Sequence, residues 1–390
     1  MSDIILLCRF GEIFLKKDNR SFFERRLVEN MKRATAPFGA RIERTHGRIL
    51  VEPRADAVDE TVAATARVFG LTSLSAARRV PRTLEAISAA AVEETRAALP
   101  SLPTPCTFKV EARRSDKRFQ PASPEIARLV GAAIVEGLGL PVDVHKPALT
   151  VGVEVGFEHA YVYARTVAAP GGLPVGVTGK VDLLLSGGID SPVAGWMAMK
   201  RGCDVAATYF HSFPFTGDRT KEKVRGLVAI LARWHGPMKF RVVPFTDAQK
   251  ALRDAGDMRM AVVLYRRMMM RVACRLARLR GATALVTGEA LAQVASQTIE
   301  NLAAIEHASD LVVLRPVLGH DKVETIAIAH RIGTYEKSIE PYEDACSMFV
   351  PKHPELHAKL DKVLAIEAKV DIAALVEACV AGTETMTVTA

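Results

Sequence analysis

The sequence predicts an α/β protein with a doubly wound parallel sheet in its C-terminal half, preceded by smaller α+β domains. After a glycine- and proline-rich stretch at residues 168–176, short apolar segments alternate with stretches of helical periodicity. This alternation is typical of a parallel sheet covered by helices on both faces. A chain of 390 residues is also longer than one hydrophobic core usually supports, so we expect at least two domains.

The first part of the chain, residues 1–59, has the pattern of a small α+β unit. An apolar strand is predicted at residues 4–10 and an amphipathic helix at residues 21–36, followed by two short strands. The next part, residues 60–165, is predicted to be a second α+β unit. Its expected elements are a helix at 84–99, a strand at 107–112, a helix after Ser123-Pro124, and strands at 149–155 and 159–166.

The second half of the chain follows a predicted linker at residues 166–178. Its expected strands are short apolar runs, namely residues 181–185, 205–210, 240–245, 284–287 and 311–314. Between them, residues 220–235 place Val224, Leu227 and Leu231 on one face of a helix. Residues 179–390 are therefore predicted to form one domain around a parallel sheet.

Bulk composition limits the classes of function. A net charge of +8 favours a polyanionic partner such as nucleic acid, although solvated lysines and arginines produce the same balance. No apolar stretch approaches the roughly 18 residues of a membrane span, and no basic leader precedes the first apolar run. We therefore expect a soluble, cytoplasmic protein without a membrane segment. The six cysteines include no Cys-x-x-Cys pair, which disfavours a zinc site and leaves buried thiols as the expectation.

The segment from Leu183 to Pro192 carries the clearest chemical signal. It joins the strand at residues 181–185 to a helix predicted to begin at Pro192. Gly187 and Gly188 allow a ligand to approach the backbone, and the helix N-terminus favours an anion. The remaining polar residues of the segment are Ser186, Asp190 and Ser191. A carboxylate repels phosphate unless a metal ion lies between them, so Asp190 indicates pyrophosphate bound with Mg²⁺.

The string Ser-Gly-Gly-Ile-Asp-Ser at residues 186–191 resembles the signature of the PP-loop ATP pyrophosphatases. Further segments resemble one family within them, the tRNA 4-thiouridine synthetases. These segments are Gly171-Gly172-Leu173-Pro174-Val175-Gly176, Phe210-His211-Ser212, Arg266-Arg267-Met268-Met269-Met270-Arg271, Thr287-Gly288-Glu289, Gln293-Val294-Ala295-Ser296-Gln297 and Pro341-Tyr342-Glu343-Asp344. Residues 1–59 are similar to that family's ferredoxin-like domain, residues 60–165 to its THUMP domain, and residues 179–390 to its PP-loop domain.

The resemblance implies an ATP-dependent tRNA sulfurtransferase. Such an enzyme adenylates the carbonyl oxygen at carbon 4 of uridine 8, releases pyrophosphate, and replaces the oxygen with sulfur. Adenylation makes chemical sense, because AMP leaves far more readily than a uracil oxygen. The implied ATP-binding residues are Leu184, Leu185, Ser186, Gly187, Gly188, Asp190, Ser191, Tyr209, Phe210, Arg266, Gly288 and Gln297.

Cys346 occupies the position of the family's sulfur-handling cysteine, so the resemblance implies that Cys346 and Asp190 are catalytic. A thiolate there can accept sulfane sulfur as a persulfide and form a disulfide when it releases that sulfur. Many relatives have a second cysteine where this chain has Ala345. We expect the form of the family without a C-terminal rhodanese domain, supplied by a cysteine desulfurase or another persulfide donor. The resolving thiol stays open among Cys203, Cys274 and Cys379.

The tRNA contacts are predicted in a basic loop of the THUMP-like region, where cations surround Phe119. The residues concerned are Arg113, Arg114, Lys117 and Arg118, and Lys322 matches a family lysine implicated in tRNA handling. Such a loop suits contacts with phosphates of the tRNA acceptor stem. The resemblance also implies a homodimer, and it leaves open a second role in supplying sulfur to a carrier protein for thiamine synthesis.

Two other readings stay open on the sequence. The first is another PP-loop adenylating ligase that uses no catalytic thiol. The second is a tRNA-binding adaptor that is not an enzyme. The unbroken Ser-Gly-Gly-x-Asp-Ser string disfavours the adaptor.

Overall fold

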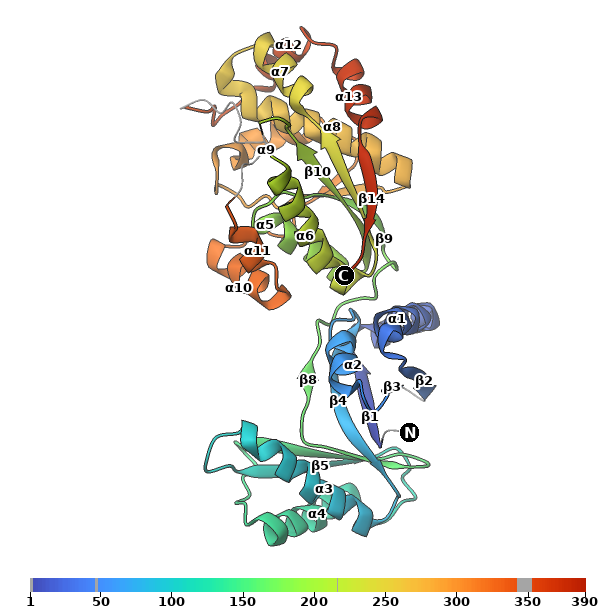
Figure 1. Cartoon of the computed structure of the whole chain (residues 1–390). Coiled ribbons are helices and arrows are strands. Elements are labelled where there is room, and N and C mark those ends of the chain that lie inside the picture. Colours follow the sequence, from blue (N-terminus) through green and yellow to red (C-terminus); the bar gives the residue numbers. More distant parts are fainter. Residues whose placement is uncertain (1–2, 46–47, 216, 342–352) are drawn as a thin grey trace. The chain divides into compact units, whose positions relative to one another are not determined.

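The computed structural model of the chain describes residues 3–45, 48–215, 217–341 and 353–390. The chain forms two compact units, Met1–Gly172 and Leu173–Ala390 (Figure 1). The division falls inside the predicted linker, next to Gly171 and Gly172, which both have positive φ angles. Glycine adopts this backbone conformation without steric cost.

Eight strands in the described part of the first unit form one mixed sheet. Its order is β2 (Arg41–Thr45), β3 (Arg48–Glu52), β1 (Ile4–Phe10), β4 (Leu71–Val80), β7 (Ala160–Tyr163), β6 (Leu149–Val155) and β5 (Phe108–Arg114), with β8 (Val167–Ala168) beside β4. Neighbouring strands are antiparallel except for the parallel pair β5 and β6. Strands from both predicted domains, residues 1–59 and 60–165, belong to this one sheet. The domain boundaries at residues 59 and 165 stay predictions.

Two hydrophobic cores lie on this sheet. Helices α1 (Arg20–Thr35) and α2 (Val58–Thr65) cover strands β1 to β4, with Leu27 of α1 in the core. Helices α3 (Leu84–Ala98) and α4 (Ser123–Leu138) cover β5 to β7, with Ile87 and Ile126 in the core. Strand β4 was not among the predicted elements. Its end carries Arg78 and Arg79, which suggest an exposed segment in the sequence. In the structure they pair with Glu94 and Glu52 of the same unit.

The second unit confirms the predicted parallel sheet. Among its described residues, six strands lie in the order β13 (Val312–Leu314), β12 (Ala284–Val286), β9 (Gly179–Leu184), β10 (Cys203–His211), β11 (Met238–Pro244) and β14 (Glu384–Val388). Strands β9 to β13 are parallel, and β14 pairs with β11 in the antiparallel direction. Strand β14 was not predicted, since its Thr-rich sequence lies at an edge and is mostly exposed.

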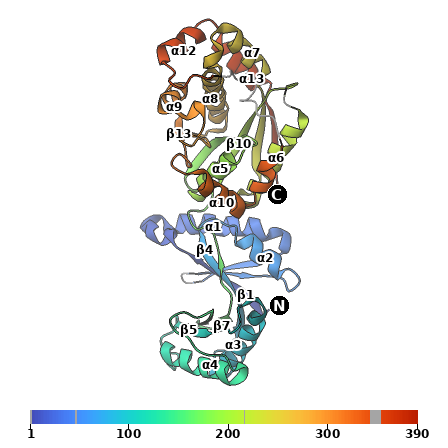
Figure 2. The ribbon, with the colours of Figure 1, turned by 90° about the vertical axis from the view of Figure 1, so that its left-hand side faces the viewer.

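Helices cover both faces of this second sheet (Figures 1 and 2). One layer contains α5 (Asp190–Lys200), α6 (Asp218–His235), α10 (Lys322–Ile332) and α11 (Tyr335–Ile339); the other contains α7 (Thr246–Ala255), α8 (Ala261–Arg280), α9 (Ile299–Glu306), α12 (Leu360–Glu367) and α13 (Ile372–Ala381). Helix α6 is amphipathic as predicted, with Val224, Leu227 and Leu231 fully buried. None of the helices in the described ranges has the length and apolar character needed to cross a membrane.

Short 3-10 segments complete the described secondary structure. They are η1 (Glu12–Asn19), η2 (Ala36–Phe38), η3 (Leu99–Ser101), η4 (Met258–Met260) and η5 (Ala295–Gln297).

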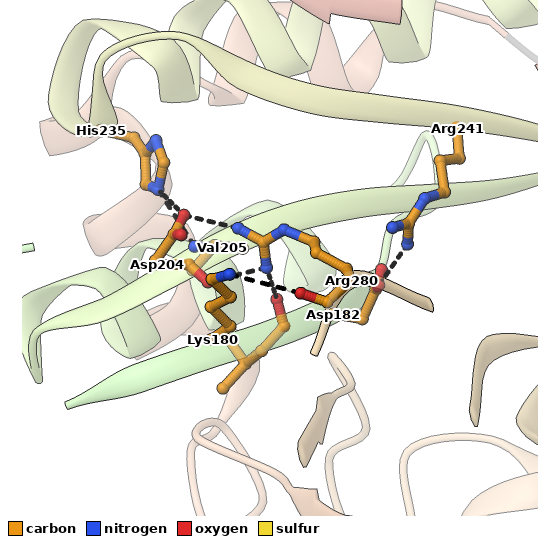
Figure 3. Close-up of polar contacts among 8 residues, drawn as sticks. Lys180, Asp182, Asp204, Val205, His235, Arg241 and Arg280 are labelled. Carbon is orange, nitrogen blue, oxygen red and sulfur yellow. Dashed lines mark hydrogen bonds and ion pairs between the residues drawn. The ribbon is translucent and has the colours of Figure 1, made fainter. Parts of the chain in front are cut away.

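Charged side chains tie the central strands of the second sheet together (Figure 3). The buried Asp182 on β9 accepts a hydrogen bond from Thr208 on β10 (2.7 Å) and pairs with Arg241 on β11. Burial raises the pKa of Asp182, and the charge of Arg241 opposes that rise. At the start of β10, Arg280 donates to Asp204 (2.6 Å). These contacts link three neighbouring strands below the edge where their carboxyl ends meet.

Candidate active site

The loop between β9 and α5 is closed by two serines. The Ser186 N–H donates to Ser191 Oγ (2.9 Å), and the two hydroxyl oxygens lie 3.1 Å apart. The Gly188 N–H donates to Ser186 Oγ (3.3 Å). Helix α5 begins at Asp190, two residues before the predicted start at Pro192. The loop therefore folds back onto a helix N-terminus, where free N–H groups and the helix dipole favour an anion.

A cavity of about 760 Å³ opens beside this loop. All the predicted ATP-binding residues except the buried Gly187 line it. They come from the carboxyl ends of β9, β10 and β12, from the first turn of α5, and from α8 and η5. In open α/β sheets, ligands bind outside the carboxyl ends of the strands. The structure thus brings together residues that lie more than a hundred positions apart in the chain.

Gly288 lies against the first turn of α5. A Cβ atom at this position would be 2.5 Å from the backbone nitrogen of Ser191 and 2.8 Å from the carbonyl carbon of Asp190. Since both neighbours are backbone atoms, no side-chain rotation relieves such a contact. Glycine is therefore required where the loop after β12 packs on the helix N-terminus.

Asp190 and Lys322 form an ion pair at the cavity wall. The Lys322 ammonium is 2.7 Å and 2.9 Å from the two carboxylate oxygens of Asp190, and Gln293 Nε2 donates to the same carboxylate (3.3 Å). Lys322 begins α10, whose N-cap Asp321 forms a capping box with Glu324. The lysine predicted to handle tRNA therefore contacts the phosphate loop directly.

Glu289, which also lines the cavity, holds two arginines and a threonine. This buried carboxylate accepts hydrogen bonds from Arg266 Nη1 (2.9 Å), Arg315 Nε (2.8 Å) and Thr287 Oγ1 (3.0 Å). Sequence reasoning assigned no role to Glu289, Gln293 or Arg315. The motifs Thr287-Gly288-Glu289 and Gln293 to Gln297 contained the signal for the first two, but only the fold places Arg315 beside them.

Gln297 presents an acceptor inside the cavity. Its side chain is buried, and its Oε1 atom has no hydrogen-bond partner among the described residues. A buried amide oxygen without a partner is costly unless a ligand or water donates to it. Phe210, Met269 and Met270 supply apolar surface to the same cavity. Together these lining groups suit a flat ring with an exocyclic donor.

The predicted catalytic Cys346 and the neighbouring Ala345 lie outside the described residues. The described residues on either side of them do reach the cavity, because Ser338, Ile339 and Pro354 line it. No cysteine in the described ranges lines the cavity. Burial raises the pKa of the Cys203 and Cys274 thiols and raises that of Cys379 to about 11. The resolving thiol therefore stays open.

The predicted tRNA-binding loop lies at the end of β5 in the first unit. Arg113 and Lys117 are exposed, and Arg118 is 86% exposed while pairing with Asp116 (3.1 Å). Arg114 instead donates to the backbone carbonyls of Lys117 and Phe119. The ring of Phe119 packs against the core of the first unit, so Phe119 supports the loop from inside.

Asp116 stabilises this basic loop from inside. It accepts hydrogen bonds from the Arg118 side chain and backbone and from Arg82 Nη2, which is 3.0 Å away. These bonds lower the pKa of Asp116 to about 2. The loop thus has an internal carboxylate that remains charged at neutral pH, with cations projecting around it.

Three family models match the chain. "Thiamine biosynthesis protein (ThiI)" covers residues 176–372, "ThiI ferredoxin-like domain" residues 5–75, and "THUMP domain" residues 81–165. A probable tRNA sulfurtransferase of Moorella thermoacetica is 47% identical over 385 residues, which are 98% of this chain and 97% of that protein. The chain belongs to the tRNA sulfurtransferase (ThiI) family. A family member from Caldanaerobacter subterraneus is also 47% identical, over 95% of this chain and 96% of its own length.

Solved structures agree with the ThiI family fold. A 4-thiouridine synthetase in complex with RNA and bound ATP is 36% identical, with a TM-score of 0.90 over 99% of both chains. A protein of Pyrococcus horikoshii is 26% identical, with a TM-score of 0.67 over 85% of this chain and 99% of that one. The predicted fold class and domain order of this ThiI family chain are confirmed. The roles of its individual site residues stay predictions.

Proposed function

We propose that this chain uses ATP to convert uridine 8 of tRNA to 4-thiouridine. The observation that supports this most directly is the composition of one cavity. A phosphate loop, the Asp190–Lys322 pair and both flanks of the Cys346 segment all reach it. Membership of the tRNA sulfurtransferase family, and a 36% identical neighbour solved with RNA and ATP, support the same substrates. Both substrates are consistent with a cytoplasmic enzyme.

ATP fits this cavity in one orientation, because different lining groups suit its phosphates and its adenine. The N–H groups of the Ser186–Ser191 loop suit the pyrophosphate portion. Gln297 Oε1 suits the amino group of adenine, and Phe210 and Met269 suit the ring. Arg266, held by Glu289 (2.9 Å), provides a fixed positive charge toward the phosphate that is attacked.

Mg²⁺ fits the same loop through Asp190. Within the described residues no group of three or more His, Cys, Asp or Glu side chains could hold a metal ion. Mg²⁺ does not need such a group, because it commonly binds one carboxylate together with phosphate oxygens and water. When bound, it would offset the negative charge of pyrophosphate beside the Asp190 carboxylate.

Adenylation is the first proposed step. The carbonyl oxygen at carbon 4 of the uridine attacks the α-phosphorus of ATP, an O–P bond forms, and pyrophosphate leaves with the electrons of the broken bond. The N3 proton of the uridine passes to water, which leaves the adenylated base neutral. Lys322 and Arg266 are the cations of the described site that stabilise the charge developing on the phosphates.

Sulfur transfer is the second proposed step. The terminal sulfur of a persulfide on Cys346 attacks carbon 4, and AMP leaves with the electrons of the broken C–O bond. A second thiolate then attacks Cys346 and breaks the S–S bond. The two electrons of the broken S–S bond stay on the sulfur bound to carbon 4, which is then at the oxidation level of a thiocarbonyl once N3 takes up a proton from water. A disulfide forms between Cys346 and the second thiol. A cysteine desulfurase would supply the persulfide.

The deciding experiment separates the two steps. Wild-type chain should form adenylated tRNA from ATP and tRNA alone, and 4-thiouridine once a cysteine desulfurase and cysteine are added. Cys346→Ser should keep adenylation and lose 4-thiouridine. Normal turnover by Cys346→Ser would favour an adenylating ligase without a catalytic thiol. No tRNA-dependent pyrophosphate release from the wild type would favour an adaptor that is not an enzyme.

A second role in thiamine synthesis is supported by one observation, the description of the family model that covers residues 176–372. The persulfide on Cys346 would then pass its sulfur to a carrier protein. Cells lacking this chain should require thiamine for growth if it serves this role. A growth requirement that Cys346→Ser fails to rescue would connect the role to the same thiol.

A further inference from the structure

Two described stretches of chain border residues 342–352, which contain Cys346. The first stretch contains α11 and ends at residue 341. The second stretch begins at residue 353 and leads into α12. Ser338 and Ile339 of the first stretch and Pro354 of the second line the nucleotide cavity. Both stretches are therefore fixed at the site where ATP is expected to bind, and particular side chains outside the cavity fix them.

Lys223 fixes the first stretch. Its side chain projects from α6 and is only 3% exposed. The ammonium group donates to the backbone carbonyls of Ser338 (2.7 Å) and Glu340 (2.6 Å). A buried ammonium group is costly unless its N–H donors are satisfied. The carbonyls of Ser338 and Glu340 accept from two of its three N–H donors, so the position of this stretch depends on Lys223.

The same stretch also contacts the phosphate loop. Ser338 Oγ donates to the carbonyl of Gly188 (3.3 Å). Lys223 itself does not line the cavity. A change at Lys223 therefore acts on residues 338–340, of which Ser338 and Ile339 line the cavity, without replacing any lining side chain.

Asn301 fixes the second stretch. This residue of α9 is fully buried. Its Nδ2 donates to the carbonyls of Ala295 (2.7 Å) and Glu355 (2.8 Å), and its Oδ1 accepts from the Ala358 N–H (2.9 Å). Because Ala295 lines the cavity, one side chain connects the cavity wall to the chain just after residue 352.

We propose that Lys223 and Asn301 are positioning residues for sulfur transfer. They hold the two ends of the segment that carries Cys346 at the nucleotide cavity, so that sulfur arrives where the uridine has been adenylated. This inference rests on the proposed function. Its physical basis is proximity, since a reacting group displaced by about 1 Å can lose on the order of 100-fold in rate. Neither side chain is needed for the attack of uridine on ATP.

The main test uses the full chain with Lys223→Met, which keeps an unbranched apolar side chain and removes the N–H donors. In single turnovers without a sulfur donor, formation of adenylated tRNA should stay within about threefold of wild type. After addition of a cysteine desulfurase and cysteine, formation of 4-thiouridine should fall at least about tenfold. Lys221→Met is the matched control, because Lys221 lies on the same helix but pairs with Glu384 (2.6 Å).

A second arm replaces the persulfide by free hydrosulfide. Hydrosulfide attacks carbon 4, AMP leaves with the electrons of the C–O bond, and the proton of hydrosulfide ends on N3. No redox step occurs, because this sulfur is already at the level of a thiocarbonyl. Since this nucleophile diffuses freely, Lys223→Met and wild type should form 4-thiouridine at equal rates with it.

The outcomes separate the inference from the proposed function. Equal losses of adenylation, persulfide-supported and hydrosulfide-supported thiolation in Lys223→Met would show a merely structural role and overturn the inference. Full persulfide-supported thiolation would overturn it as well. If Lys223→Met does not fold, Asn301→Leu, which has nearly the same shape, loses both N–H donors and adds no buried charge, decides by the same measurements. Absence of 4-thiouridine from the wild type with either sulfur source would overturn the proposed function instead.

Discussion

Asp190 shows how a single residue joins several parts of the site. It is the first residue of α5, and its carboxylate contacts Lys322 at 2.7 and 2.9 Å. Both side chains are partly exposed, so the pair contributes at most about 1 kcal/mol to folding. Its importance under the proposed function is for the ligand, because the carboxylate lies at the loop that is proposed to bind the triphosphate with Mg²⁺.

We predict that Asp190→Asn lowers tRNA-dependent pyrophosphate release on the order of 100-fold. The variant should unfold at nearly the wild-type temperature, because an exposed ion pair adds little stability. Pyrophosphate release by the purified chain and thermal unfolding together check this. Asp247→Asn, an exposed position in the first turn of α7, is the control and should retain activity. Wild-type pyrophosphate release by Asp190→Asn would contradict the role of Asp190.

At the scale of elements, the site depends on how closely the loop after β12 approaches α5. The closest approach is at Gly288, where a Cβ atom would lie 2.5 Å from the nitrogen of Ser191. That contact forces one backbone segment to move. The shape of the phosphate loop therefore depends on a glycine from a different strand.

Gly288→Ala is predicted to weaken ATP binding at least about tenfold, because the displaced loop no longer presents its N–H groups to the phosphates. Equilibrium binding of ATP measures this. Gly319→Ala is the matched control, since an added Cβ there meets nothing within 4 Å. Unchanged ATP affinity in Gly288→Ala would show that the loop tolerates the shift.

Helices α8 and α12 are joined by a buried carboxylate. Glu367 accepts two hydrogen bonds from Arg267 (2.8 Å each) and two from Arg271 (2.7 and 2.8 Å). Burial would raise the pKa of Glu367, but the bonds and charges of the two arginines outweigh it and lower the pKa to about 2. A depressed folded pKa means that the pair stabilises the fold above the ordinary carboxyl pKa and loses that effect as the pH falls toward 2.

Glu367→Gln should lower the free energy of unfolding by about 3 kcal/mol at pH 7, since it leaves two arginines without their carboxylate. The difference from wild type should shrink as the pH falls from about 4.5 toward 2. Urea unfolding at several pH values measures it. Glu377→Gln removes a more exposed pair between α8 and α13 and should cost less than about 1 kcal/mol at every pH. A pH-independent difference for Glu367→Gln would contradict the assignment.

At the scale of the whole molecule, two functions are expected from two units. The predicted ATP-binding residues lie in the second unit, and the exposed cations Arg113, Lys117 and Arg118 lie in the first. Contacts between cations and phosphates supply affinity that falls with salt concentration. Defects in tRNA binding and in ATP binding should therefore be separable.

The triple substitution of Arg113, Lys117 and Arg118 by alanine should weaken tRNA binding at least about tenfold and flatten its salt dependence by roughly one unit of slope for each lost phosphate contact. ATP affinity should not change. Binding titrations at several salt concentrations measure both. Arg128→Ala, an exposed arginine of α4 that pairs with Glu125, is the control. An unchanged salt slope in the triple variant would place the tRNA contacts elsewhere.

The missed elements show where sequence reasoning reaches its limit. The five parallel strands of the second unit were predicted because each is a short apolar run between turns. Strands β4 and β14 were missed because their exposed or ion-paired residues give no clear alternation. Such strands are defined by their partners in the sheet, which a local pattern does not contain.

The sequence by itself determined the α/β fold class, and it predicted a phosphate-binding loop and, by resemblance, the other ATP-binding residues. These features depend on local order, namely apolar periodicity and an unbroken Ser-Gly-Gly-Ile-Asp-Ser string. Only the tertiary structure decided that Lys322 meets Asp190, that Glu289 joins Arg266 to Arg315, and that Lys223 and Asn301 hold the flanks of the Cys346 segment. The physical reason is that hydrogen bonds and ion pairs between distant residues depend on distances of about 3 Å, which strand order and helix packing set.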